Sequence, residues 1–121
     1  MASTFEIQLT PAEANHPGTG RFTFTKSWAG DMVGTSSGEM LSAGDPRAGN
    51  AGYVAIEVFD GSIDGRVGTV VFTQQGTMTD GEPSLDYRVA PGSGTGDLAG
   101  LTGALVLEID SDGTHRVRLA P

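Results

Sequence analysis

The sequence predicts an all-β fold, an eight-stranded antiparallel β-barrel with a lipocalin-like cavity, built by one domain over residues 1–121. Most segments alternate apolar and polar residues with a period of two, which is typical of strands with one buried face. Turn residues such as Gly, Asn and Asp separate these segments, and only "GDLAGL" has the pattern of a single helical turn. A sandwich also fits short strands, but closure into a barrel is favoured because it removes exposed strand edges.

The first half of the chain contains four expected strands. In "TFEIQLT" every second residue is apolar, and Pro11 ends the run. "RFTFTKSW" places two phenylalanines, Lys26 and Trp28 on one face, and the Gly30-Asp31 pair turns the chain into the strand that contains "GTSSGEML". After the loop "GDPRAGNAG", the run "YVAIEVF" supplies the fourth strand.

The second half supplies the other four strands. "GTVVFTQQGT" follows "YVAIEVF" across "DGSIDGRVG", whose residues tolerate positive φ, so these runs form the clearest hairpin. "PSLDYRVAP" alternates in the same way. "ALVLEID" and "HRVRL" form the last pair across a Ser-Asp-Gly turn.

Composition excludes several classes of function. Seven Lys and Arg residues stand against fifteen Asp and Glu residues, a net charge of −8 that disfavours nucleic acid and membrane surfaces as partners. The chain has no cysteine, and its two histidines, His16 and His115, lie far apart in sequence, so no metal site is expected. The N-terminal segment lacks the pattern of a signal peptide, which predicts a soluble, cytoplasmic protein.

The glycine-rich stretch "VAPGSGTGDLAGLTGALVLEI" can be read as a phosphate-binding loop or as a structural corner. A dinucleotide fingerprint needs a helix after its glycines, but a strand-like run follows here, and the loop has no lysine for a P-loop. We therefore interpret these glycines as residues that allow sharp turns and close backbone approach: Gly92, Gly94, Gly96, Gly100 and Gly103.

This stretch is similar to the glycine-rich segment of allene oxide cyclase and the dirigent proteins. Together with "GTSSGEML" and "YVAIEVFDGSIDGRVGTVVFTQQGT", it more closely resembles a small bacterial family of unknown function with the same type of barrel. The resemblance covers about three quarters of the chain, from the second strand onward. It implies a barrel with a central cavity, assembled as a dimer or trimer. The cyclases of this superfamily use no cofactor and fold a flexible substrate within an apolar pocket.

One position departs from that family. Its members often carry a histidine near the end of the strand that here reads "VVFTQQGT", and we place that position at Gln74. If Gln74 lines the cavity, an amide stands where relatives have a possible acid or base. The catalytic carboxylate of allene oxide cyclase has no counterpart that can be aligned here.

Glu57 is the first candidate catalytic residue. It shares one face of its strand with Tyr53 and Phe59, so in a barrel it should point into the lumen beside aromatic rings. Burial would raise the pKa of this carboxyl and suit it to proton transfer. The alternative is a solvent-facing glutamate, or one neutralised by Lys26 or Arg88.

Glu39 is the second candidate, because it lies among small neutral residues and next to Ser36 and Ser37. Its alternative is an ordinary exposed strand glutamate. Five further side chains are candidates for substrate binding, although the aromatic ones could equally be core: Trp28, Tyr53, Phe72, Gln74 and Tyr87.

Three functions follow from these observations. The first is a cofactor-independent cyclase or isomerase acting on a flexible apolar molecule, polyketide-like or lipid-like. The second is a barrel that binds such a molecule without catalysis, and the third is a filled barrel that serves assembly. A homo-oligomer is expected in each case, because Val54, Ile56 and Val58 form an apolar face opposite the one assigned to the lumen.

Overall fold

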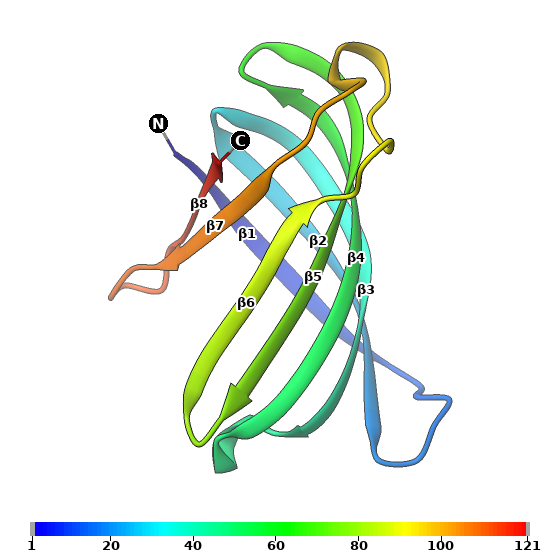
Figure 1. Cartoon of the computed structure of the whole chain (residues 1–121), viewed down its shortest axis with the longest axis vertical. Helices are drawn as coiled ribbons and strands as arrows, with labels where there is room; N and C mark the ends of the chain where they lie inside the picture. Colours follow the sequence, from blue (N-terminus) through cyan, green and yellow to red (C-terminus); the bar gives the residue numbers. More distant parts are fainter. Residues whose placement is uncertain (1, 121) are drawn as a thin grey trace.

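The computed structural model describes residues 2–120 and shows a closed antiparallel barrel in which each strand pairs with the next (Figure 1). The predicted fold class and the absence of long helices are confirmed. The strands are β1 (Ser3–Ala12), β2 (Thr19–Gly30), β3 (Met32–Asp45), β4 (Asn50–Ile63), β5 (Arg66–Thr79), β6 (Glu82–Val89), β7 (Ala104–Ile109) and β8 (His115–Ala120). Two short 3₁₀ turns, η1 (Pro46–Ala48) and η2 (Gly96–Leu98), complete the chain.

The barrel wall is complete only in its upper half, as oriented in Figure 1. Strand β1 pairs with β8 only over Ser3–Phe5, and β6 is joined to β7 at one register position, Arg88 opposite Ala104. Because β7 and β8 have six residues each while β3, β4 and β5 have fourteen, they cover only part of the length of the barrel. The lower halves of β1 and β6 therefore border an opening in the wall.

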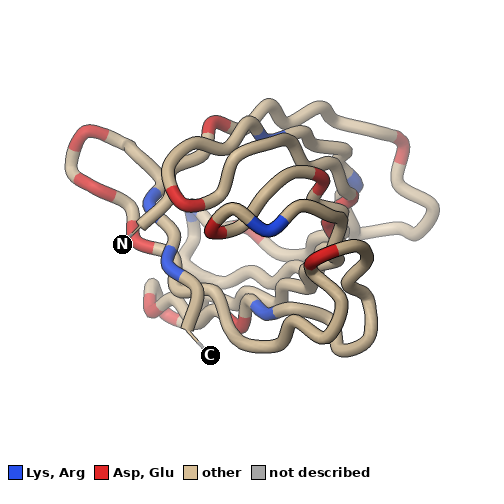
Figure 2. The backbone as a smooth tube through the Cα atoms, turned by 90° about the horizontal axis from the view of Figure 1, so that it is seen from above, with Lys and Arg blue, Asp and Glu red and all other residues tan. Residues whose placement is uncertain are grey.

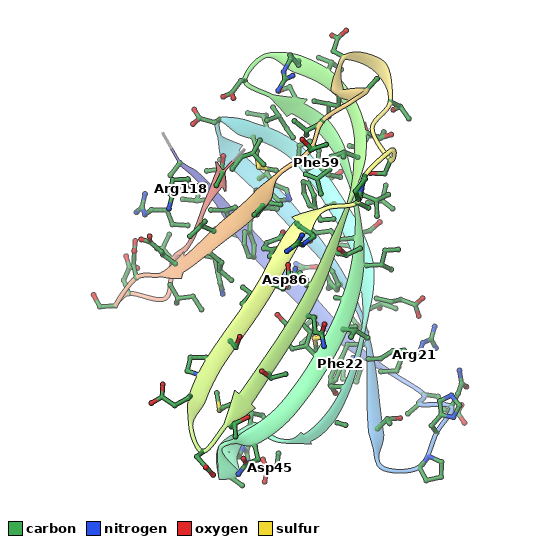
Figure 3. The ribbon with its side chains drawn as sticks, viewed as in Figure 1. Arg21, Phe22, Asp45, Phe59, Asp86 and Arg118 are labelled. Atoms are coloured by element: carbon green, nitrogen blue, oxygen red, sulfur yellow. The ribbon has the colours of Figure 1, made fainter. Side chains whose placement is uncertain are left out.

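The upper half of the barrel is filled by aromatic and aliphatic side chains. Phe59 and Phe72 are fully buried, with ring centroids 6.0 Å apart, and Trp28 meets Phe59 edge to face at 6.0 Å. Figure 3 shows Phe59 in this half and Phe22 in the lower half. Close packing of these rings leaves the lower half as the part of the lumen that could take up a ligand.

The glycine-rich loop between β6 and β7 packs against β5 near the upper end of the barrel. Its backbone bonds to the edge of β5, where Thr95 N donates to Thr69 O at 2.8 Å and Ala90 N donates to Val71 O at 2.9 Å. Leu98, in η2, is fully buried. A side chain at Gly68 would strike the Thr95 carbonyl oxygen, so close backbone approach requires glycine there. The prediction of a structural corner, with one helical turn at "GDLAGL", is confirmed.

The outer surface combines an apolar face with dispersed charge. Val54, Ile56 and Val58 point outward from β4, and Ile56 is 54% exposed. Figure 2 shows acidic residues spread around the whole barrel, without one dominant acidic patch. Within residues 2–120, no helix has the length and apolar character needed to cross a membrane.

Candidate functional site

Glu57 lies at the centre of a buried polar cluster inside the barrel. Strand alternation predicted that it would point into the lumen, and its residue is 0% exposed. The cluster consists of five side chains from five neighbouring strands, β2 to β6: Lys26, Ser36, Glu57, Gln74 and Tyr87. Each is on the inward face of its strand, so the antiparallel register itself brings them together.

The Glu57 carboxylate accepts hydrogen bonds from four neighbours. Lys26 Nζ and the Tyr87 hydroxyl each lie 3.0 Å from Oε1, and Gln74 Nε2 lies 3.5 Å from the same oxygen. Ser36 Oγ donates to Oε2. Donors of this kind stabilise the ionised carboxylate. The sequence left open whether Glu57 faces the lumen, faces solvent or is neutralised by Lys26 or Arg88. In the structure, Glu57 is buried in the lumen and paired with Lys26.

Lys26 is the cationic partner and is equally enclosed. Its side chain is 3% exposed, and Nζ also lies 3.3 Å from the Tyr87 hydroxyl. The ammonium group faces the ring of Phe5 at 4.2 Å from the centroid, a cation–π contact. Burial lowers the pKa of the Lys26 amine, while the charge and hydrogen bond of Glu57 oppose that shift.

Tyr87 is held as a neutral phenol. Burial raises the pKa of Tyr87, and the nearby negative charge of Glu57 and the hydrogen bond to it raise this pKa further. The hydroxyl therefore stays a donor over the physiological pH range. Together, Lys26, Glu57 and Tyr87 present a cation, an anion and a neutral hydroxyl within hydrogen-bond distance of one another.

Two further contacts fix the orientation of the cluster. Trp28 Nε1 donates to Ser36 Oγ at 3.0 Å, and the Tyr53 hydroxyl donates to Gln74 Oε1 at 2.9 Å. Burial raises the pKa of Tyr53, so this phenol also remains a donor. The network thus runs from the filled aromatic half, through Glu57, to the wall of the open half.

A cavity of about 190 Å³ lies beside the cluster in the open half of the barrel. Its polar lining is Lys26, Tyr53, Gln74 and Tyr87, and its remaining walls are mostly apolar: Phe5, Ile7, Leu9, Phe24, Met40, Ala55, Leu107, Ile109 and His115. A wider hollow of about 550 Å³ at the lower end shares Met40 and Tyr53 with it. An apolar chamber with a small polar floor is the usual form of a small-molecule site.

The structure brings together some predicted site residues and separates others. Tyr53, Gln74 and Tyr87 line the cavity, whereas Trp28 and Phe72 are buried in the filled half. Glu39 lies on the outer face, where its side chain is 49% exposed and accepts from Arg21 Nε at 2.7 Å. It is not part of the cluster, because odd-numbered residues of β3 point away from the lumen.

Sequence reasoning named Lys26 only as one possible counter-charge for Glu57, and it missed Ser36 as a partner of Glu57. A signal for Lys26 existed, because it is the only lysine in the sequence and it occupies the apolar face of its strand. The His115 ring stacks on Phe5, with 4.8 Å between the ring centroids, and lines the cavity. This contact joins β8 to β1, the last and the first strands, where the barrel closes. A contact between such distant parts of the chain cannot be predicted from the local pattern of residues.

Comparisons with known proteins agree on one family. The family model described as a protein of unknown function, DUF3224, matches residues 1–120. A crystal structure of a DUF3224 protein of unknown function from Shewanella oneidensis MR-1 is 38% identical, with a TM-score of 0.89, over 100% of this chain and 96% of that one. Comparison with curated proteins finds no match. The chain, with its half-open barrel and buried Lys26–Glu57 pair, therefore belongs to the DUF3224 family.

Proposed function

We propose that the protein binds a flexible apolar small molecule in the open half of the barrel and isomerises or cyclises it without a cofactor. The observation that carries this proposal is the buried cluster of Lys26, Glu57 and Tyr87 beside an apolar cavity. A buried ion pair is a poor way to stabilise a fold, because apolar residues of similar volume often do so better. Its position at the cavity favours a role in recognition or chemistry.

The cavity walls suggest how such a molecule would be held. Ile7, Leu9 and Ile109 point toward the cavity and yet are exposed, so they offer apolar surface that the protein itself does not cover. A hydrocarbon chain lying against them would bury this surface. Its polar end would then meet Lys26 and Tyr87, which makes a carbonyl oxygen, an acceptor, the matching group.

The same arrangement supports proton transfer. With a carbonyl oxygen accepting from Tyr87 and Lys26, negative charge that develops on that oxygen is stabilised. The Glu57 carboxylate, a few ångströms away, could remove a proton from the neighbouring carbon and return it at another position. Apolar walls that restrict the conformers of the chain would supply the rest of the rate. The resemblance to barrels of allene oxide cyclase type supports this chemistry by analogy.

Binding without catalysis is the second candidate, and one observation favours it. Among residues 2–120, every buried side-chain nitrogen and oxygen has a hydrogen-bond partner. Glu57 already accepts from four donors, so it must give up at least one of them to act as a base. A cluster that keeps all these bonds would recognise a ligand without transforming it.

Two measurements separate these candidates. Trp28, the only tryptophan of the chain, should report binding of 1-decanol through its fluorescence. Deuterium exchange at the α-carbon of 2-decanone, followed by NMR in D₂O, detects proton transfer. We expect catalysed exchange that falls by roughly a hundredfold in Glu57→Gln, the usual scale for one acid–base group. Glu39→Gln, the same change at an exposed carboxylate outside the cluster, is the control.

The outcomes are distinct. Binding with exchange that depends on Glu57 supports the proposed enzyme. Binding of both probes without exchange above the buffer rate would leave only the binding barrel. If neither probe binds, as judged by both Trp28 fluorescence and equilibrium dialysis, both candidates are wrong. Location in the cytoplasm stays a prediction from the sequence.

A further inference from the structure

Lys26 is unusual among the basic residues of this chain. The other six are arginines, all at least partly exposed, whereas the single lysine is enclosed in the barrel. Lysine is rarely fully buried, and arginine is the better residue for a buried ion pair, because its guanidinium is more weakly hydrated and binds a carboxylate in a bidentate way. A primary amine at this position therefore calls for a reason beyond charge pairing.

A primary amine can do what a guanidinium does not, which is to attack a carbonyl carbon. Lys26 lines the cavity, so a molecule bound there can reach its side chain. Burial lowers the pKa of this amine, which increases the fraction in the nucleophilic, neutral form. Glu57, at 3.0 Å, is placed to accept the proton that the ammonium must lose, and Tyr87, at 3.3 Å, is placed to donate to a carbonyl oxygen.

We infer that the ligand is an apolar aldehyde or ketone and that Lys26 Nζ binds it covalently and reversibly, as an imine. This inference rests on the proposed function, because it requires that the cavity takes up an apolar molecule. It deepens that function by assigning the reactive group of the ligand and the atom that binds it.

The chemical steps balance without a further reactant. The Lys26 ammonium transfers a proton to Glu57, and the neutral amine then forms a C–N bond to the carbonyl carbon. The carbonyl oxygen takes up one of the two protons of the attacking nitrogen. Glu57 returns a proton to the resulting hydroxyl group, the C–O bond breaks, and water leaves. Overall, one ammonium and one carbonyl give one protonated imine and one water.

Charge conservation makes this site suitable for an imine. The protonated imine keeps the positive charge of Lys26, so the buried Glu57 carboxylate still has its counter-charge and pays no new desolvation cost. The Phe5 ring, 4.2 Å from Nζ, can stabilise either cation. Once an apolar chain covers the exposed walls, the filled cavity would exclude water, which would otherwise hydrolyse the imine.

Reductive trapping tests the inference on the unmodified protein. Decanal is incubated with the protein and sodium cyanoborohydride, whose hydride adds to the imine carbon and leaves a stable secondary amine. Because Lys26 is the only lysine, fragment mass spectrometry needs to distinguish it only from the α-amino group of the chain. We expect trapping at Lys26 to be about tenfold or more faster in the folded protein than in the urea-unfolded protein.

Controls separate covalent capture from simple binding. 1-Decanol cannot form an imine, so it should bind, perturb Trp28 fluorescence and slow the trapping of decanal. Lys26→Arg keeps the positive charge but should lose the adduct at position 26. If this variant does not fold, the location of the adduct in the wild-type protein still decides the matter.

Each outcome bears on a different claim. A decyl adduct on Lys26 that 1-decanol suppresses supports the inference. If 1-decanol binds but decanal is trapped only at the α-amino group, the imine is wrong and the binding function stands. If neither compound binds, the proposed function fails, and the imine fails with it.

Discussion

Glu57 and Lys26 depend on each other, because each is an enclosed charge whose main counter-charge is the other. Removing one partner leaves an uncompensated buried charge, whereas removing both leaves a neutral site. We expect Lys26→Met to lower the free energy of unfolding by about 3–5 kcal/mol. Lys26→Met combined with Glu57→Gln should recover most of that loss. Urea denaturation measures both, and a double variant no more stable than the single one would contradict this interdependence.

The two tyrosines give the protein a predictable response to alkali. The pKa values of Tyr53 and Tyr87 are both raised, mainly by burial. An unfolded chain releases phenolic protons near pH 10, while the folded protein retains them, so stability is lost as the pH rises above 10. The expected slope is about 1.4 kcal/mol per pH unit for the deeply buried Tyr87 and smaller for the half-buried Tyr53. Tyrosinate absorbance from Tyr87 should therefore appear only with unfolding, and absorbance from both tyrosines near pH 10 in folded protein would show this to be wrong.

At the scale of single strands, the sequence was sufficient for most of the architecture. Alternation placed Phe5, Phe24 and Phe59 correctly inside, because every second residue of a strand points to the same face. It could not show the partial closure of the barrel, since the pairing of β1 with β8 joins residues more than a hundred positions apart. Cluster membership depends both on which face of a strand is inward and on the register between strands. The first excludes Glu39, which is on the outer face of β3, and the second brings Ser36 to Glu57.

Gly38 allows β3 to pass close to the strand that carries Glu57. It lies opposite Glu57 in the register, and a side chain there would strike the Ile56 carbonyl oxygen and come within 2.7 Å of Phe24 Cζ. We expect Gly38→Ala to lower the free energy of unfolding by about 1–3 kcal/mol through overpacking.

Gly52 on β4 is the matched control for this variant. The nearest atom to an added side chain there is 3.7 Å away, which is ordinary contact distance. Gly52→Ala should therefore leave stability unchanged or raise it by up to about 1 kcal/mol, through reduced entropy of the unfolded chain. Thermal unfolding of the two variants compares them directly, and equal effects would disprove the role assigned to Gly38.

At the scale of the whole molecule, the outer face of β4 predicts self-association. Val54, Ile56 and Val58 are each about half exposed, although the lumen lies on the other side of their strand. We expect a dimer or trimer in sedimentation experiments at micromolar concentration. Ile56→Lys should shift the protein toward the monomer. The added lysine makes the net charge of −8 less negative, so stronger electrostatic repulsion between copies cannot explain that shift. A wild-type protein that is strictly monomeric would contradict the prediction.

The central claim is that an apolar molecule occupies the open half of the barrel with its polar end at Lys26. Since the chain contains one lysine, protein labelled with ¹³C-lysine gives a single set of side-chain signals from inside the barrel. Titration with 1-decanol should shift the Lys26 Cε resonance along a saturable curve. A Lys26 resonance that stays unchanged up to the solubility limit of 1-decanol would contradict the claim.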